Sequence, residues 1–151
     1  MFTIEKPKEI HLNSWKEIIN ESASSNSFQF EEVNFSLFWT CIFRDDYFAF
    51  AAKNEDKFMG IVVAKINETY YEKNIVLDVL YVLQDFRKIG VARALMNKIE
   101  EIAKEKNLDL IIKGVEKSNL LAQKLFKNYA VVNRTRSVSY THLRAHETSV
   151  D

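Results

Sequence analysis

The segment from residue 74 to residue 106 constrains the fold more than any other part of the chain. It begins with a nearly continuous apolar run, Ile75 to Leu83, which is rich in β-branched residues and contains one acidic residue, Asp78. A short basic loop with Gly90 follows, and then a long amphipathic stretch that ends near Lys106. This pattern predicts a buried strand, a tight connection and a helix packed on the sheet, which together are the basic unit of an α/β domain.

Hydrophobic patterning on both sides extends this unit into a mixed sheet. The predicted strands are 2–4, 47–52, 58–66, 74–83, 108–115 and 131–140, and the predicted helices are 11–19, 30–43, 89–106 and 118–128. The polar stretch 21–27 is expected to be a loop. The resulting order is β-α-α-β-β-β-α-β-α-β, with hairpins first and crossover units after them. The long helix is expected to pack one face on the sheet, formed by Val91, Leu95, Ile99 and Ile102.

Length, charge and cysteine content exclude several classes of protein. A chain of 151 residues predicts one domain with its own core. Its 21 basic and 21 acidic residues cancel, so it lacks the basic field that nonspecific nucleic-acid binding needs. Cys41 is the single cysteine, the N-terminus is charged where a signal peptide is apolar, and no run is long enough for a membrane span. We therefore expect a cytoplasmic protein with no nucleic-acid or membrane partner.

The loop between the central strand and the long helix is the first candidate site. The first turn of a helix has unsatisfied N–H groups and a partial positive charge, and both favour a phosphate. Gly90 permits a positive φ and a close approach of the backbone to a ligand, while Arg87 and Lys88 add positive charge. An ordinary βα turn with solvated basic residues fits the same pattern, so these residues alone leave both interpretations open.

Four segments together resemble one known family. The pattern Arg87-x-x-Gly90-x-Ala92 resembles the Arg/Gln-x-x-Gly-x-Gly/Ala signature of the GCN5-related N-acetyltransferases, the GNAT family. Further similar segments are Leu80-Tyr-Val, Ala94-Leu-Met and Asn119-x-x-Ala-x-x-Leu-Phe126. The resemblance is best over residues 47–140. It implies an α/β fold with a mixed, mostly antiparallel twisted sheet, helices on both faces and a splayed central strand pair, in a single N-acetyltransferase domain spanning residues 1–140.

The resemblance also implies a cofactor and a reaction. Acetyl-CoA, or another acyl-CoA, would be the co-substrate, with no metal, and an amine would attack the thioester directly in a ternary complex. Backbone N–H groups of residues 87–92 would hold the pyrophosphate, backbone groups of Val82 and Leu83 would pair with the pantetheine arm, and the N–H of Leu80 would polarise the thioester carbonyl. The implied cofactor-binding residues are Val82, Leu83, Arg87, Lys88, Ile89, Gly90, Val91, Ala92, Asn119 and Phe126.

Asp78 is the candidate catalytic base. A carboxylate on a buried central strand should have a raised pKa because of desolvation, and it should be paired or functional. Asp78 resembles a glutamate that some family members, including polyamine acetyltransferases, carry at this position. We predict that it acts as a base through water; a carboxylate in a salt bridge within the sheet is the alternative.

Phe126 is a departure from the family pattern. It stands where the family usually has a tyrosine, assigned as the acid that protonates the departing thiolate. General acid catalysis contributes ~10²–10⁴ in rate, and a thiol with a pKa of about 8.5 is a tolerable leaving group, so transfer would be slowed rather than abolished. Water or Tyr129 could replace the tyrosine, or Phe126 could simply line the cofactor channel. The alternative function is a catalytically weak or inactive acyl-CoA-binding module.

A nucleotide-binding domain is a further alternative for the glycine loop, but that fold places its phosphate glycines after the first strand, whereas Gly90 follows the fourth predicted strand.

The acceptor would be a small-molecule or peptide amine, and the family often forms homodimers. The resemblance places the acceptor pocket at the first two helices, their loop and the hairpin, and this region is rich in aromatic residues. They fit an amine pocket with cation–π contacts, or, as we favour, the core face of an amphipathic helix. These residues are Phe28, Phe30, Phe35, Phe38, Trp39 and Phe43, with Glu31 and Glu32 beside them.

The C-terminal residues 141–151 differ from the rest of the chain. They lack strand alternation, and the stretch 139–148 resembles translated adapter read-through, so we expect a non-native or disordered tail. His142 and His146 have the i, i+4 spacing of metal ligands. Leu143 stands where a zinc protease has its glutamate, and no third ligand is evident, so no metal site is predicted.

Overall fold

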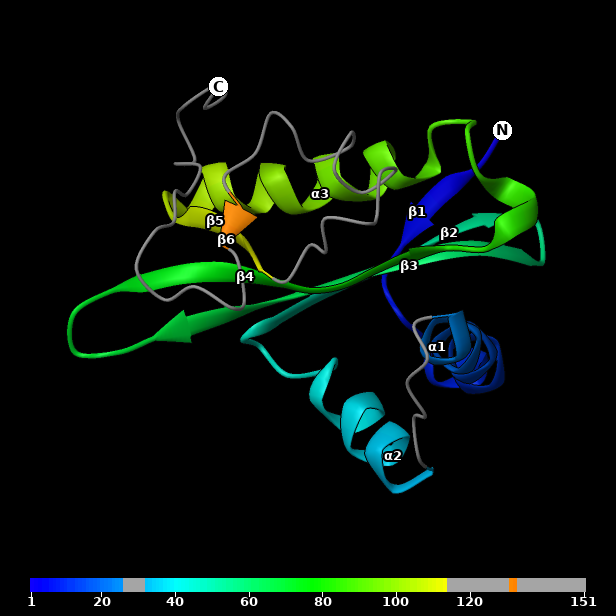
Figure 1. The fold of residues 1–151 in the computed structure, drawn as a ribbon, viewed down its shortest axis with the longest axis horizontal. Helices are drawn as coiled ribbons and strands as arrows, with labels where there is room; N and C mark the ends of the chain where they lie inside the picture. Colours follow the sequence, from blue (N-terminus) through cyan, green and yellow to red (C-terminus); the bar gives the residue numbers. More distant parts are fainter. Residues whose placement is uncertain (26–31, 114–130, 133–151) are drawn as a thin grey trace. The chain divides into compact units, whose positions relative to one another are not determined.

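The computed structural model describes residues 1–25, 32–113 and 131–132 (Figure 1). Its helices are α1 (Leu12–Ser25), α2 (Glu32–Cys41) and α3 (Val91–Lys106), with two short 3₁₀ turns, η1 (Glu9–His11) and η2 (Gln84–Phe86). Its strands are β1 (Thr3–Glu5), β2 (Tyr47–Asn54), β3 (Lys57–Glu68), β4 (Lys73–Val82), β5 (Asp109–Lys113) and β6 (Val131–Val132).

The strands form one sheet in chain order, β1-β2-β3-β4-β5-β6. β1 is antiparallel to β2, with Thr3 opposite Lys53. β2, β3 and β4 are joined by connections too short for a parallel crossover, so these neighbours are antiparallel as well. β5 is parallel to β4, with Leu77 opposite Ile112, and β6 is parallel to β5. The sheet is therefore mixed and mostly antiparallel, as the sequence predicts.

The chain packs as two compact units. One unit contains Met1–Val63 and Asp78–Met96, and the other contains Ala64–Leu77 and the chain from Asn97 onward. β3, β4 and α3 each contribute residues to both units. The loop after β4 and the first turns of α3 belong entirely to the first unit, so the candidate site can be described within it.

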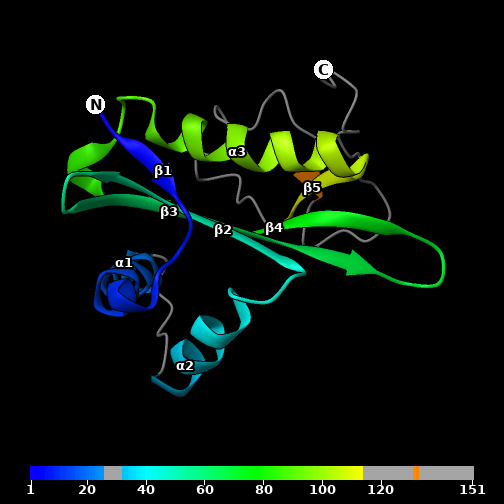
Figure 2. The same cartoon turned by 180° about the vertical axis from the view of Figure 1, so that it is seen from behind.

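The core of the first unit lies between the strands and α1 and α2, which cover the same face of β2 (Figures 1 and 2). Its buried members are Trp15, Ile18, Ile19, Phe35, Ile42, Ala49, Ala51, Ile61 and Val63. On the strands these are alternate residues, as expected for side chains that share one face. The intervening Phe50, Ala52 and Val62 are also buried, so both faces of these strands are covered.

The stripe of α3 predicted to be buried is largely confirmed. Val91, Leu95 and Ile99 are almost fully buried, whereas Ile102 is half-buried and Ala103 continues the stripe instead. The helix ends because Asn107 adopts a positive φ of 55° and the Leu108 N–H donates to the Ala103 carbonyl, which satisfies a terminal carbonyl of the helix.

Some predicted boundaries were wrong or lie outside the described residues. Residues 21–25 continue α1 rather than forming a loop, because buried Ile18 and Ile19 anchor the preceding turn and the polar residues after them can stay solvated in helical form. The predicted helix 118–128 and the tail 141–151 lie outside the described residues, as does most of the predicted strand 131–140.

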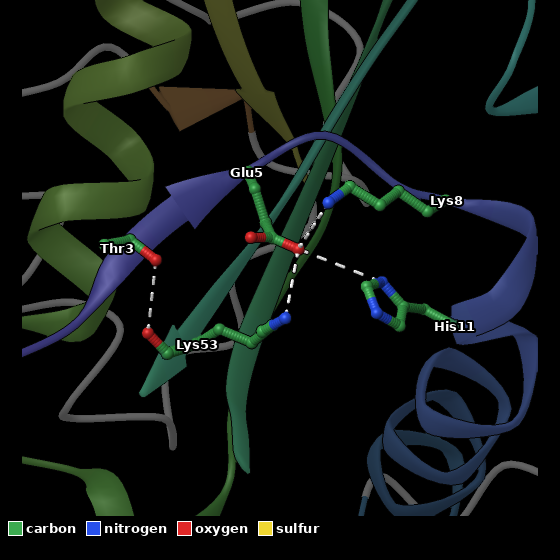
Figure 3. Close-up of polar contacts among 5 residues, drawn as sticks. All are labelled: Thr3, Glu5, Lys8, His11 and Lys53. Atoms are coloured by element: carbon green, nitrogen blue, oxygen red, sulfur yellow. Dashed lines mark hydrogen bonds and ion pairs between the residues drawn. The ribbon is translucent and has the colours of Figure 1, made fainter. Parts of the chain in front are cut away.

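A cluster of charges joins β1 to the start of α1 (Figure 3). The Oε1 atom of Glu5 lies 3.4 Å from Lys53 Nζ, 3.8 Å from His11 Nδ1 and 3.9 Å from Lys8 Nζ. The side chains of Glu5 and Lys53 are only 25% and 15% exposed, so this ion pair is less screened than one on an open surface. The carboxylate therefore holds the first strand, its neighbour β2 and η1 together.

We predict that Glu5→Gln lowers the free energy of unfolding by about 1 kcal/mol, because it leaves Lys53 without its carboxylate in a partly buried position. Glu9→Gln, an exposed change in the same segment, is the matched control and should change stability by less than about 0.5 kcal/mol. Urea denaturation at neutral pH measures both values. Equal effects of the two substitutions would contradict a structural role for the charge cluster.

Candidate functional site

The loop that joins β4 to α3 has an unusual backbone. Lys88 has a φ of 67° and Gly90 a φ of 91°, so two nearly adjacent residues adopt the left-handed region. A Cβ atom added at Gly90 would meet nothing within 4 Å. Glycine is therefore needed at this position for its conformation and not for space.

Several consecutive amides of this loop have no acceptor among the residues that the structure describes. The N–H of Arg87 donates to the Gln84 carbonyl at 3.4 Å, and that of Ala94 to the Gly90 carbonyl at 3.0 Å. Between them, the amides of residues 88–93 donate to no carbonyl among the described residues. They lie at and just before the N-terminus of the long helix α3, where the helix dipole adds a partial positive charge. The loop can therefore accept an anion without first breaking a hydrogen bond.

The backbone of β4 presents two different edges. The Leu83 N–H donates to the Met59 carbonyl of β3 at 2.9 Å. Since the N–H and C=O of one residue in an antiparallel strand share an edge, and successive residues alternate, Leu80 and Val82 direct their backbone groups away from β3. The described pairing of β4 with β5 ends at Leu77, so neither residue has a strand partner on that edge in the described part of the chain.

In its pairing with β3, β4 contains one extra residue. At the hairpin, the Thr69 N–H donates to the Glu72 carbonyl, and further along the Leu83 N–H donates to the Met59 carbonyl. Between these two pairs β4 uses one residue more than β3, which is the definition of a β-bulge. Val79 already packs on the core face together with Val63, so the extra residue lies before Val79.

Asp78, which directly precedes Val79, is exposed. The expectation that the carboxylate would be buried in the sheet is therefore wrong. The apolar run predicted a uniformly covered strand, whereas a bulge redirects side chains locally. No lysine, arginine or histidine in the described ranges forms an ion pair with Asp78, so the salt-bridge alternative finds no partner there.

The Arg87 side chain turns back onto β4. Its Nε donates to the Val82 carbonyl at 2.9 Å, and its guanidinium lies 5.4 Å from the centre of the Tyr81 ring. These contacts join the two ends of the loop to each other. Arg87 therefore shapes the loop through its N–H and its planar cation instead of extending its charge into solvent.

Tyr81 connects this loop to the first helix. Its hydroxyl donates to Glu21 Oε2 at 3.1 Å, across a separation of 60 residues in the sequence. Tyr81 packs on the core face with Val79 and Leu83, that is, on the side of α1 and α2. Neither residue was predicted from the sequence, because Glu21 fell in an expected loop and a tyrosine in an apolar strand is usually a packing residue.

Tyr47 is a second tyrosine that the sequence analysis missed. It is half-buried, and this burial raises the pKa of its phenol above the ordinary value of 10.0. A hydrogen bond to Cys41 and the negative charges of Cys41, Asp78 and Asp46 raise the pKa further. Tyr47 and Asp78 are thus near enough to influence each other, and the phenol is neutral at physiological pH.

The aromatic residues of α2 mostly support the packing interpretation. Phe35 is buried, Phe38 and Trp39 are half-buried against the core, and Phe43 is exposed. The Trp39 ring lies 6.0 Å from Trp15 and 5.0 Å from Phe43, measured between ring centres. Phe43, which follows the C-terminal end of α2, is therefore the most exposed ring of this group among the described residues.

Several predicted site residues lie outside the described residues. They are Phe28, Phe30, Glu31, Asn119, Phe126, Tyr129, His142 and His146. Among the residues that are described, no group of three or more His, Cys, Asp or Glu side chains is arranged to hold a metal ion. None of the described helices is long and apolar enough to cross a membrane.

Comparison with known families agrees with this architecture. The sequence model of the acetyltransferase (GNAT) family matches residues 13–130, which is most of the chain. The protein therefore belongs to the GNAT acetyltransferase family. No curated protein matches it in sequence.

Solved structures share the fold at low sequence identity. A possible acetyltransferase from Clostridium difficile 630 is 15% identical, with a TM-score of 0.71 over 84% of this chain and 88% of the other. The aminoglycoside acetyltransferase AAC(6')-Iy, bound to a CoA-containing bisubstrate analogue, is 18% identical, with a TM-score of 0.71 over 84% and 88%. The aminoglycoside acetyltransferase meta-AAC0020 from an uncultured soil metagenomic sample is 17% identical, with a TM-score of 0.69 over 83% and 85%.

We predict that Tyr47 ionises above pH 10.0 in the folded protein. Because its folded-state pKa is raised, the stabilisation that it contributes is present below pH 10 and is lost as the pH rises through the folded pKa. In an ultraviolet absorbance titration, the wild-type protein should show a tyrosine ionisation above pH 10 that is absent from the Tyr47→Phe variant. A Tyr47→Phe difference curve with its midpoint at or below 10 would contradict the burial of this phenol.

Proposed function

We propose that the protein is an N-acetyltransferase that moves an acetyl group from acetyl-CoA, or another acyl group from its CoA thioester, to an amine. The observation that carries this proposal is the row of amides at residues 88–93 with no acceptor in the described structure, at the start of a long helix. Family membership supplies the reaction class, and the CoA-bound relatives of the same fold support the choice of co-substrate. The proposal takes residues 1–140 as a single N-acetyltransferase domain.

In this proposal each part of the site has its own role. The amides of residues 88–93 would hold the pyrophosphate, with Lys88 as a nearby cation. The N–H of Val82, which points away from β3, would pair with the pantetheine arm, while the Val82 carbonyl already accepts from Arg87 Nε. The N–H of Leu80, on the same edge, would polarise the thioester carbonyl. Leu83 would contribute through its side chain, because its N–H is engaged with Met59 and its carbonyl accepts from Phe86. Asn119 and Phe126 remain in the proposed cofactor-binding set.

The reaction needs little covalent chemistry from the protein. The amine nitrogen attacks the carbonyl carbon of the thioester, a C–N bond forms, the C–S bond breaks, and sulfur leaves as a thiolate. The nitrogen loses a proton, which exposed Asp78 would receive through water. Charge developing on the carbonyl oxygen would be stabilised by the Leu80 N–H, so positioning and polarisation would provide most of the rate.

The test is an assay of thiol release from acetyl-CoA with a panel of primary amines, together with calorimetric binding of CoA. Wild-type protein should bind CoA and acetylate at least one amine. Gly90→Ala should weaken CoA binding by about tenfold, because alanine is strained at the positive φ that the loop requires. Binding of CoA with no product from any amine would indicate the alternative, a non-catalytic acyl-CoA-binding module. Absence of CoA binding would contradict both.

Two substitutions at Arg87 separate its N–H from its charge. The side-chain nitrogen of glutamine lies the same number of bonds from Cα as Arg Nε, so Arg87→Gln can keep the bond to the Val82 carbonyl, whereas Arg87→Lys keeps the charge and loses that donor. We expect Arg87→Lys to weaken CoA binding by about tenfold and Arg87→Gln to weaken it by less than about threefold. The opposite order would show that Arg87 acts on the phosphate through its charge.

A further inference from the structure

Gly60 of β3 lets this strand approach the end of β4 more closely than a residue with a side chain would. A Cβ atom added at Gly60 would lie 2.8 Å from the Tyr81 carbonyl oxygen and 3.1 Å from both Cα and Cγ2 of Val82. Two of these three atoms belong to the backbone of β4, which cannot turn aside as the end of a flexible side chain can. Glycine is therefore needed at residue 60 for space, whereas at residue 90 it is needed for conformation.

The oxygen that Gly60 faces belongs to the same peptide group as a proposed cofactor donor. The Tyr81 carbonyl and the Val82 N–H are parts of one planar trans peptide, so they point in opposite directions. The bond from the Leu83 N–H to the Met59 carbonyl fixes which edge each one faces. The Tyr81 carbonyl faces β3, and the Val82 N–H faces away from it. Any displacement of the Tyr81 oxygen therefore also tilts the Val82 N–H.

The surroundings of Val82 give this peptide little freedom to adjust. The Val82 residue is only 8% exposed, and its carbonyl accepts from Arg87 Nε at 2.9 Å. The next amide, that of Leu83, is already bonded to β3. A side chain at residue 60 would push against both the Tyr81 oxygen and the Val82 Cα, and would move this peptide away from β3. That direction leads to the edge where the pantetheine arm is proposed to lie.

We propose that Gly60 is a positioning residue for the cofactor: it sets the orientation of the Tyr81–Val82 peptide, so that the Val82 N–H meets the pantetheine arm. This inference rests on the proposed function, since it concerns the co-substrate of that reaction. It divides the site into two parts. The peptide set by Gly60 receives the arm, and the amides of residues 88–93 receive the phosphates. The long Arg87 side chain can follow a small shift of the Val82 carbonyl, so a substitution at Gly60 leaves the second part intact.

The test compares two ligands by calorimetry: CoA, and adenosine 3′,5′-bisphosphate, which is the nucleotide part of CoA without the pantetheine arm. Gly60→Ala should weaken CoA binding by about tenfold, as expected for one hydrogen bond lost at the arm, and should change bisphosphate binding by less than about twofold. Gly90→Ala, which strains the phosphate loop itself, should weaken the binding of both ligands. Val62→Ile, which adds one carbon at a buried position of the same strand, is the matched control and should retain both wild-type affinities.

The outcomes distinguish a positioning role from a role in stability. If Gly60→Ala weakens CoA and the bisphosphate equally, or changes neither, the inference is overturned. If Gly60→Ala does not fold, as judged by circular dichroism, the same substitution is made in a Val82→Ala background, where removal of Cγ2 relieves one of the three contacts. A loss that is selective for CoA, relative to Val82→Ala alone, supports the inference. An unselective loss, no loss, or an unfolded double variant overturns it.

The wild-type protein separates this inference from the proposed function. If it binds neither ligand, the proposed function fails and the positioning role fails with it. If it binds CoA but not the bisphosphate, the division of the site into two parts is wrong, and only the inference is overturned. Binding of both ligands by the wild type, with a loss in Gly60→Ala that is confined to CoA, supports both.

Discussion

One hydrogen bond, from the Leu83 N–H to the Met59 carbonyl, determines which way the end of β4 faces. Because backbone groups alternate along an antiparallel strand, this bond directs Tyr81 toward β3 and directs Leu80 and Val82 away from it. The donors proposed for the thioester and the pantetheine arm are thus selected by strand register rather than by side-chain identity. The close contact at Gly60 agrees, since a Cβ there would lie 2.8 Å from the Tyr81 carbonyl oxygen.

From this strand end a short series of contacts reaches both the cofactor loop and the first helix. Arg87 donates a hydrogen bond to the Val82 carbonyl and lies over the Tyr81 ring, and the Tyr81 hydroxyl donates to Glu21. The loop whose amides are available to an anion is therefore tied to the same two residues that position the carboxylate on α1. The proposed cofactor loop and the first helix therefore share a support at the end of β4.

Local sequence patterns predicted the parts of the fold that depend on local interactions. The apolar run of β4, the 3.6-residue period of α3 and the need for glycine at residue 90 are each visible within a few residues. Asp78 was misjudged because an apolar run reports average burial and does not reveal a bulge. Glu21 was missed because its role arises from Tyr81, 60 residues away, and α1 was ended too early because serine-rich segments have no strong preference against a helix.

The alternation of backbone groups at the end of β4 places a limit on how this segment can evolve. Substitutions between Val79 and Leu83 leave the backbone pattern intact, because amides are donated whatever the side chain. An insertion or deletion of one residue there would turn the Leu80 amide toward β3 and bring the Tyr81 amide to the opposite edge. Homologous chains should therefore vary freely in composition over this stretch while keeping its length constant, and length variation should be confined to the tip of the β3–β4 hairpin.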